Sequence, residues 1–148
     1  MKKLLYIMAA VLVLAACGKN NDSKKTPAEL LCGQWHSTSL TVSGDVYLDF
    51  TDDGRFEMYQ KMGDGAYRLY RGTWNAEEDL LTGRYNDGED WATAYRIAIE
   101  GTSLTMTSQN DAAEVTKYSS CTIPDEVKNG CEIVVKSSEG GLSPPFSC

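Results

Sequence analysis

Eight short runs of β-forming residues, separated by turn residues, constrain the fold of this chain more than any other feature. Apolar residues recur at every second position in several runs, as at Val46, Leu48 and Phe50, which is typical of a strand with one buried face. No long helical periodicity interrupts the series. The expected strands are Gln34–Val42, Val46–Thr51, Arg55–Met62, Tyr67–Asn75, Leu81–Tyr85, Trp91–Glu100, Ser103–Ser108 and Glu114–Ser120.

This series predicts an all-β domain, an eight-stranded antiparallel up-and-down barrel, because closure removes both exposed sheet edges. A β-sandwich is the alternative, since periodicity alone does not separate the two. Thr26, Pro27 and Glu29 form a capping box with proline at the first helical position. We therefore expect a short helical turn directly before the first strand.

The N-terminus indicates export. Lys2 and Lys3 precede an apolar stretch, residues 4–14, that is too short to span a bilayer as a helix. The run Leu14-Ala15-Ala16-Cys17 resembles the lipobox of bacterial lipoproteins, in which the cysteine is acylated and becomes the first residue of the mature protein. The alternative is an ordinary signal peptide with a chance cysteine.

The lipobox resemblance implies a signal peptide over residues 1–16 and a lipid-bearing tether over residues 17–25. Acyl chains such as palmitate on Cys17 would attach the protein to the lipid bilayer. Gly18 stands where an aspartate commonly signals retention in the inner membrane, so the resemblance favours an outer-membrane lipoprotein of the cell envelope. The periplasmic and surface faces of that membrane both remain open.

The charge of the mature chain limits its partners. The 14 basic residues include Lys2 and Lys3, so removal of residues 1–16 leaves 12 basic against 21 acidic residues, a net charge of −9. Nucleic-acid binding needs clustered basic residues, so we expect none. The acyl chains, and not attraction to anionic lipid, would account for membrane association.

Four cysteines remain besides Cys17, and an even number in an exported chain indicates two disulfides with three possible connectivities. In a closed barrel, Cys32 precedes the first strand and Cys121 follows the eighth, so both lie at one rim. We expect these two to pair within the short separation that a disulfide needs, and Cys131 to pair with Cys148 and staple the C-terminal tail.

The start of the first strand, Gly33-Gln34-Trp35, resembles the Gly-x-Trp signature of lipocalins, in which the tryptophan closes one end of the barrel. The wider pattern over residues 30–127 is similar to lipocalin-like domains of bacterial lipoproteins. Its matching pieces are Phe50-x-x-Asp53-Gly54-x-Phe56, Tyr70-Arg71-Gly72-Thr73-Trp74, Leu81-x-Gly83-x-Tyr85, Trp91-x-x-x-Tyr95 and Leu104-Thr105-Met106-Thr107. The resemblance implies a barrel domain over residues 26–127 and a tail, residues 128–148, packed on it.

The chain offers no constellation for catalysis. His36 is the only histidine, and its neighbour Trp35 should point to the opposite face of the strand. The paired carboxylates at Asp52-Asp53 and Glu77-Glu78-Asp79 lie in expected hairpin turns, not in a sheltered site. We therefore expect no catalytic residues, no metal and no cofactor.

The barrel interior is the remaining candidate site. Eight strands enclose a space that side chains fill, or that holds one small ligand, and both readings remain open. The residues that would line a cavity are Met58, Trp74, Tyr85, Trp91 and Tyr95. The sequence thus predicts a non-catalytic, membrane-anchored protein that binds a small apolar or amphipathic ligand. The rival is a solid barrel that contacts a protein partner through its loops or tail.

Overall fold

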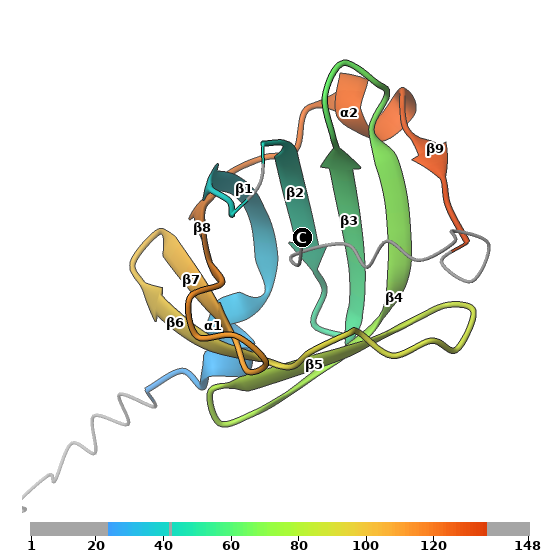
Figure 1. Ribbon diagram of the computed structural model, residues 1–148. Coiled ribbons are helices and arrows are strands. Elements are labelled where there is room, and N and C mark those ends of the chain that lie inside the picture. Colours follow the sequence, from blue (N-terminus) through green and yellow to red (C-terminus); the bar gives the residue numbers. More distant parts are fainter. Residues whose placement is uncertain (1–23, 42, 136–148) are drawn as a thin grey trace, which may run out of the picture.

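The computed structural model describes residues 24–41 and 43–135, and within them eight strands form a closed antiparallel barrel (Figure 1). Each strand pairs with the next in sequence, and the eighth pairs with the first, so the predicted up-and-down barrel is confirmed. The strands are β1 (Gly33–Ser39), β2 (Asp45–Phe50), β3 (Arg55–Lys61), β4 (Arg68–Glu77), β5 (Leu80–Tyr85), β6 (Tyr95–Glu100), β7 (Ser103–Ser108) and β8 (Val115–Ser120).

Bulky side chains fill the barrel interior. The alternating residues Val46, Leu48 and Phe50 of β2 all point inward and are at most 1% exposed. The same alternation on the other strands builds one continuous core. Its largest fully buried members are Leu31, Leu48, Phe50, Phe56, Met58, Tyr70, Leu81, Tyr95, Leu104, Met106 and Tyr118. An eight-stranded barrel is narrow enough for side chains of this size to occupy its centre.

The helical turn α1 (Pro27–Leu31) precedes the barrel, as predicted. The capping box is present: Thr26 accepts a hydrogen bond from the backbone of Glu29, whose carboxylate accepts one from the backbone of Thr26. Leu31 is completely buried in the core, and its carbonyl accepts a hydrogen bond from Nε1 of Trp35, 2.9 Å away. The turn therefore closes one end of the barrel through its last residue.

The segment after β8 packs on the outside of the barrel. The helix α2 (Asp125–Asn129) covers the outer face of β3 and β4, where Val127 and Ile123 bury Tyr59 and Leu69 in a second apolar cluster. The short strand β9 (Glu132–Ile133) then runs parallel to the start of β4 (Figure 1). The predicted tail thus begins on this surface, and residues 136–148 lie outside the described residues.

The predicted disulfide between Cys32 and Cys121 is wrong, because both residues are free cysteines in the structure. The backbone N–H of Cys121 donates to the carbonyl of Gln34, so Cys121 lies beside Gln34 and not beside Cys32. Cys32 Sγ instead contacts the carbonyl of Ala28 at 3.4 Å. Cys131 is also free, and its expected partner Cys148 lies outside the described residues.

The sixth strand begins at Tyr95, four residues later than predicted. Residues 86–94 instead fold back along β5: the N–H of Tyr85 donates to Glu89, and the N–H of Trp91 donates to Gly83. The β-like residues around Trp91 therefore pair with β5 outside the main ladder. This segment forms part of the wall beside the candidate site.

Candidate functional site

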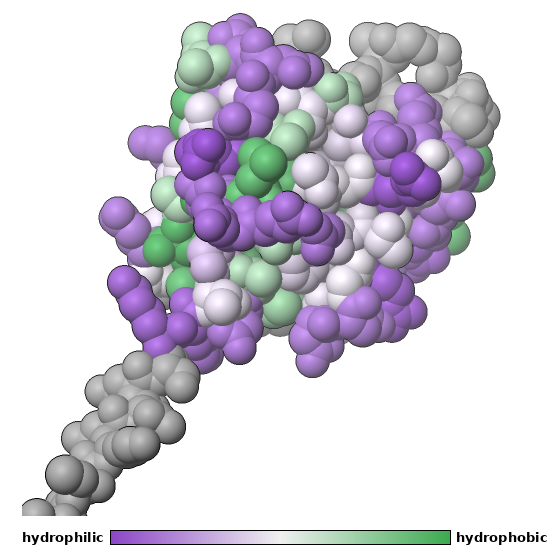
Figure 2. Space-filling view, turned by 90° about the horizontal axis from the view of Figure 1, so that it is seen from below, coloured by the Kyte–Doolittle hydropathy of each residue, from purple (hydrophilic) through white to green (hydrophobic). Residues whose placement is uncertain are grey.

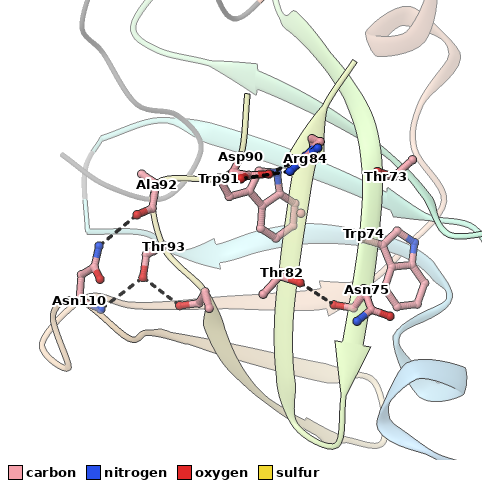
Figure 3. A pocket seen from close by; sticks show the side chains of 12 residues that line it. Thr73, Trp74, Asn75, Thr82, Arg84, Asp90, Trp91, Ala92, Thr93 and Asn110 are labelled. Atoms are coloured by element: carbon pink, nitrogen blue, oxygen red, sulfur yellow. Dashed lines mark hydrogen bonds and ion pairs between the residues drawn. The ribbon is translucent and has the colours of Figure 1, made fainter. Parts of the chain in front are cut away.

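The five residues predicted to line a cavity fall into two groups. Met58, Tyr85 and Tyr95 are at most 4% exposed and belong to the packed core, so they line no open interior space. Trp74 and Trp91 instead border an open groove beside β5 (Figure 3). The structure therefore moves the candidate site from the barrel centre to its wall.

The groove has a volume of about 580 Å³ and follows β4, β5 and the fold-back segment (Figure 3). Its position follows from the register of the sheet, in which Trp74 pairs with Gly83 and Asn75 pairs with Thr82. Across from them lie residues 92–94 and Asn110. The complete lining is Thr73, Trp74, Asn75, Thr82, Gly83, Arg84, Asp90, Trp91, Ala92, Thr93, Ala94 and Asn110.

The two tryptophans are held by different contacts. Trp74 is half-buried, meets Phe50 edge to face at 5.6 Å, and donates from Nε1 to the carbonyl of Arg55 at 3.0 Å. Trp91 is 7% exposed and meets Phe56 edge to face at 5.1 Å. Both rings are therefore fixed in orientation, and they give the groove an apolar component.

A polar network forms the opposite side of the groove. The buried hydroxyl of Thr93 accepts hydrogen bonds from Ser108 Oγ, at 3.4 Å, and from the backbone N–H of Asn110, at 3.2 Å. The Asn110 side chain donates to the carbonyl of Ala92 at 3.1 Å (Figure 3). These bonds fix the turn after β7 against residues 92–94.

Among the lining residues, only Arg84 and Asp90 carry a charge, and they pair with each other. Nε of Arg84 lies 2.6 Å from Oδ1 of Asp90, and one terminal nitrogen lies 3.3 Å from Oδ2. Both side chains are more than half exposed, so water screens this pair. The groove as a whole is thus neutral, with aromatic, hydroxyl and amide surfaces.

The sequence missed most of the polar lining. Thr93 and Asn110 lie in connections where threonine and asparagine are common turn residues, so their types alone give no signal. Gly83 does give a signal in the sequence, because a glycine inside a strand often marks a place where other atoms approach the backbone closely. A Cβ there would lie 2.2 Å from the Trp91 ring.

His36 points outward from β1, opposite to Trp35, as predicted. Its Nε2 lies 2.6 Å from Oδ1 of Asp45, and Tyr67 donates to the other carboxylate oxygen. Burial alone would raise the pKa of Asp45, but hydrogen bonds from Tyr67, His36 and Ser37 hold it below its ordinary value. Ser37 donates to Asp45 and not to His36, so the residues do not form a nucleophilic triad.

Within residues 24–41 and 43–135, no three His, Cys, Asp or Glu side chains group closely enough to hold a metal ion. In the same part of the chain, no helix has the length and apolar character needed to cross a membrane.

Comparison with known proteins identifies the family. Residues 31–106 match the lipocalin-like domain family, which covers just over half of the chain and agrees with the closed eight-stranded barrel. The chain therefore belongs to the lipocalin-like domain family, whose members are generally non-catalytic binding proteins. No curated protein matches the sequence.

Proposed function

We propose that the protein is a lipid-anchored, non-catalytic binding protein of the cell envelope, which holds one small amphipathic molecule in the groove beside β5. The observation that carries this proposal is the composition of the groove, where Trp74 and Trp91 face a network of threonine and asparagine side chains. Aromatic rings beside oriented hydroxyl and amide groups give an amphipathic molecule both an apolar wall and hydrogen-bond partners.

The chemistry of the groove favours a neutral ligand. Arg84 and Asp90 satisfy each other, so a charged ligand gains no ion pair without breaking theirs. Thr82 and Asn75 present hydroxyl and amide groups on adjacent strands, which suit a ligand with hydroxyl or carbonyl groups. The apolar part of such a ligand leaves water against the tryptophans, at about 25 cal/mol per Å².

The anchoring half of the proposal rests on the lipobox-like run that ends at Cys17. Figure 2 looks onto the molecule from below, where hydrophilic groups surround small apolar patches. The described residues on that face offer no broad apolar surface for insertion, so the acyl chains on Cys17 would supply the membrane affinity.

The binding half is tested by native mass spectrometry of protein purified in mild detergent from the cells that make it. We expect a co-purifying small molecule, lost from Trp74→Ala because this change removes one aromatic wall of the groove. Tyr47→Ala is the matched control, since Tyr47 packs against the outer apolar cluster and not the groove. Repeated preparations without any bound molecule would contradict ligand binding.

A second candidate function is a protein-interaction module, and the edge beside β4 favours it. Ile133 and Val135 are 69% and 53% exposed and lie two residues apart, which gives this edge of the barrel an apolar surface. In-cell crosslinking from a photoreactive residue at position 133 should capture a partner if this edge is an interface. Capture there, together with an empty groove, would favour this second function.

A further inference from the structure

The barrel wall has one short seam, between β5 and β6. Only two residue pairs join these strands, Leu80 with Arg96 and Leu81 with Tyr95. The other neighbouring strands of the barrel share four to six pairs each. Beyond Leu81, β5 and β6 separate, and the gap between them is closed by residues 86–94.

The closing segment is attached to β5 by few interactions. Two backbone hydrogen bonds, from Tyr85 to Glu89 at 2.8 Å and from Trp91 to Gly83 at 2.9 Å, flank the bridge between Arg84 and Asp90. The ion pair of that bridge is exposed and contributes little to its stability. At its two ends the segment is held more firmly, because Asn86 donates to the carbonyl of Arg71 on β4 and residues 92–94 are bonded to Gln109 and Asn110. Opening is therefore confined to residues 87–91, and it requires far less than unfolding of the barrel.

The indole of Trp91 fills a slot on the inner side of this seam. It lies flat against Gly83, whose missing side chain leaves room for it: a Cβ there would be 2.2 to 2.6 Å from the ring. Phe56 and Tyr95 meet the indole edge to face, at 5.1 and 6.1 Å with angles of 72° and 70° between the planes. The slot is thus shaped for one flat aromatic ring.

We propose that a flat aromatic ring of the ligand replaces the Trp91 indole in this slot when residues 87–91 turn away from β5. The ligand would then enter the barrel through the seam between β5 and β6. The ligand ring takes over the edge-to-face contacts with Phe56 and Tyr95, and its polar part extends along the groove toward Asn75 on β4. This inference rests on the proposed ligand-binding function and specifies its ligand class and entry route.

A disulfide between positions 84 and 90 tests the opening directly. The hydrogen bonds on either side make Arg84 and Asp90 a non-hydrogen-bonded antiparallel pair. Such pairs have Cα atoms about 4.5 Å apart, within the range that a disulfide bridges. The double variant R84C/D90C, oxidised, holds residues 87–91 on β5, and dithiothreitol releases them. The single variants R84C and D90C carry the same native thiols and serve as controls.

The probe is N-phenyl-1-naphthylamine, a neutral aromatic dye whose fluorescence rises in apolar sites. We expect the oxidised double variant to take up the dye at least tenfold more slowly than the reduced form, and the single variants to be unaffected by dithiothreitol. Equal uptake by the oxidised and reduced forms, with the disulfide confirmed by peptide mapping, would overturn the seam entry while leaving ligand binding in place.

The variant Trp91→Ala gives a second readout. It vacates the slot, so we expect faster and tighter dye uptake than in the wild type, with far-ultraviolet circular dichroism confirming the folded barrel. A folded Trp91→Ala protein that binds the dye no better than the wild type would contradict the slot. Absence of dye binding by both proteins would contradict the proposed function itself. If Trp91→Ala does not fold, the disulfide experiment alone tests entry through the seam between β5 and β6.

Discussion

Directly before β8, Glu114 places its carboxylate partly inside the barrel wall. Its Oε1 atom is buried and has no hydrogen-bond partner among the described residues. Burial raises the pKa of this carboxyl, and the negative charge of Asp111 raises it further. A hydrogen bond with Ser108 lowers the pKa, but by less than burial raises it. The folded protein therefore binds a proton at Glu114 more tightly than the unfolded chain does.

The pH dependence follows from this difference. An unfolded glutamate titrates near its ordinary value of 4.5, and folded Glu114 titrates above it. Between those two values folding takes up a proton, so Glu114 lowers stability as the pH rises through this window. We predict that Glu114→Gln increases the free energy of unfolding at pH 7 and flattens its pH dependence. Urea unfolding from pH 4 to 8 measures both quantities.

Asp45 provides the contrasting case and the control. The pKa of Asp45 is lowered by its three hydrogen-bond donors. Ionised Asp45 therefore stabilises the fold above the ordinary pKa of 3.8, and this stabilisation is lost as the pH falls through the lower pKa of the folded protein. Asp45→Asn should therefore lower stability at pH 7, opposite to Glu114→Gln. If both variants shift stability in the same direction, the electrostatic account of Glu114 is wrong.

At the scale of elements, the fold-back segment and β5 depend on the absence of a side chain at Gly83. A Cβ at this position would lie 2.2 Å from the Trp91 ring, so Gly83→Ala must displace either the indole or the strand. We predict a loss of about 1–3 kcal/mol in the free energy of unfolding, as for other overpacked cores. Chemical denaturation measures this loss.

Gly65→Ala is the control for the Gly83 variant. Its added Cβ would meet no atom closer than 4.0 Å, and Gly65 does not need a positive φ. We expect this variant to be as stable as the wild type or slightly more stable, because alanine restricts the unfolded chain. An equal effect of the two substitutions would show that the contact with Trp91 does not control stability.

The strands were predictable because alternation is a local pattern. Val46, Leu48 and Phe50 report the inward face of β2 without knowledge of any partner strand. The region around Trp91 was misassigned to β6 because its pairing with Gly83 depends on contacts across a turn and on the register of β5. Apolar composition marks such residues as buried, but it does not say which strand they pair with.

The candidate site was predictable only in part, for a related reason. Trp74 and Trp91 were identified from their size and aromatic character, and both border the groove. Met58 and Tyr95 share that apolar character yet lie in the packed core, since the sequence does not give the volume left inside the barrel. The cysteine pairing failed because the sequence does not give the register between β1 and β8, which sets Cys121 opposite Gln34.

At the scale of the whole molecule, one outer surface of the barrel is covered by the segment after β8 and another is not. The helix α2 and strand β9 cover the outer side of β3 and β4, whereas β5 and the seam remain uncovered by them (Figure 1). The turn α1 closes one end of the barrel through Leu31. The groove beside β5 therefore lies on a part of the wall that neither α2 nor β9 covers.

The proposed acylation of Cys17 is the basis of the last prediction. Residues 17–25 reach at most roughly 30 Å when extended, so acylation of Cys17 would hold the α1 end of the barrel close to the bilayer. We predict that Cys17→Ser abolishes labelling by an alkyne analogue of palmitate and moves the protein from the detergent phase to the aqueous phase. The barrel should remain folded, because its first helical residue, Pro27, is ten positions further on. Cys32→Ser should keep its label. Labelling that persists in Cys17→Ser, or that disappears in Cys32→Ser, would place the acyl chain elsewhere and remove the reason for holding α1 at the membrane.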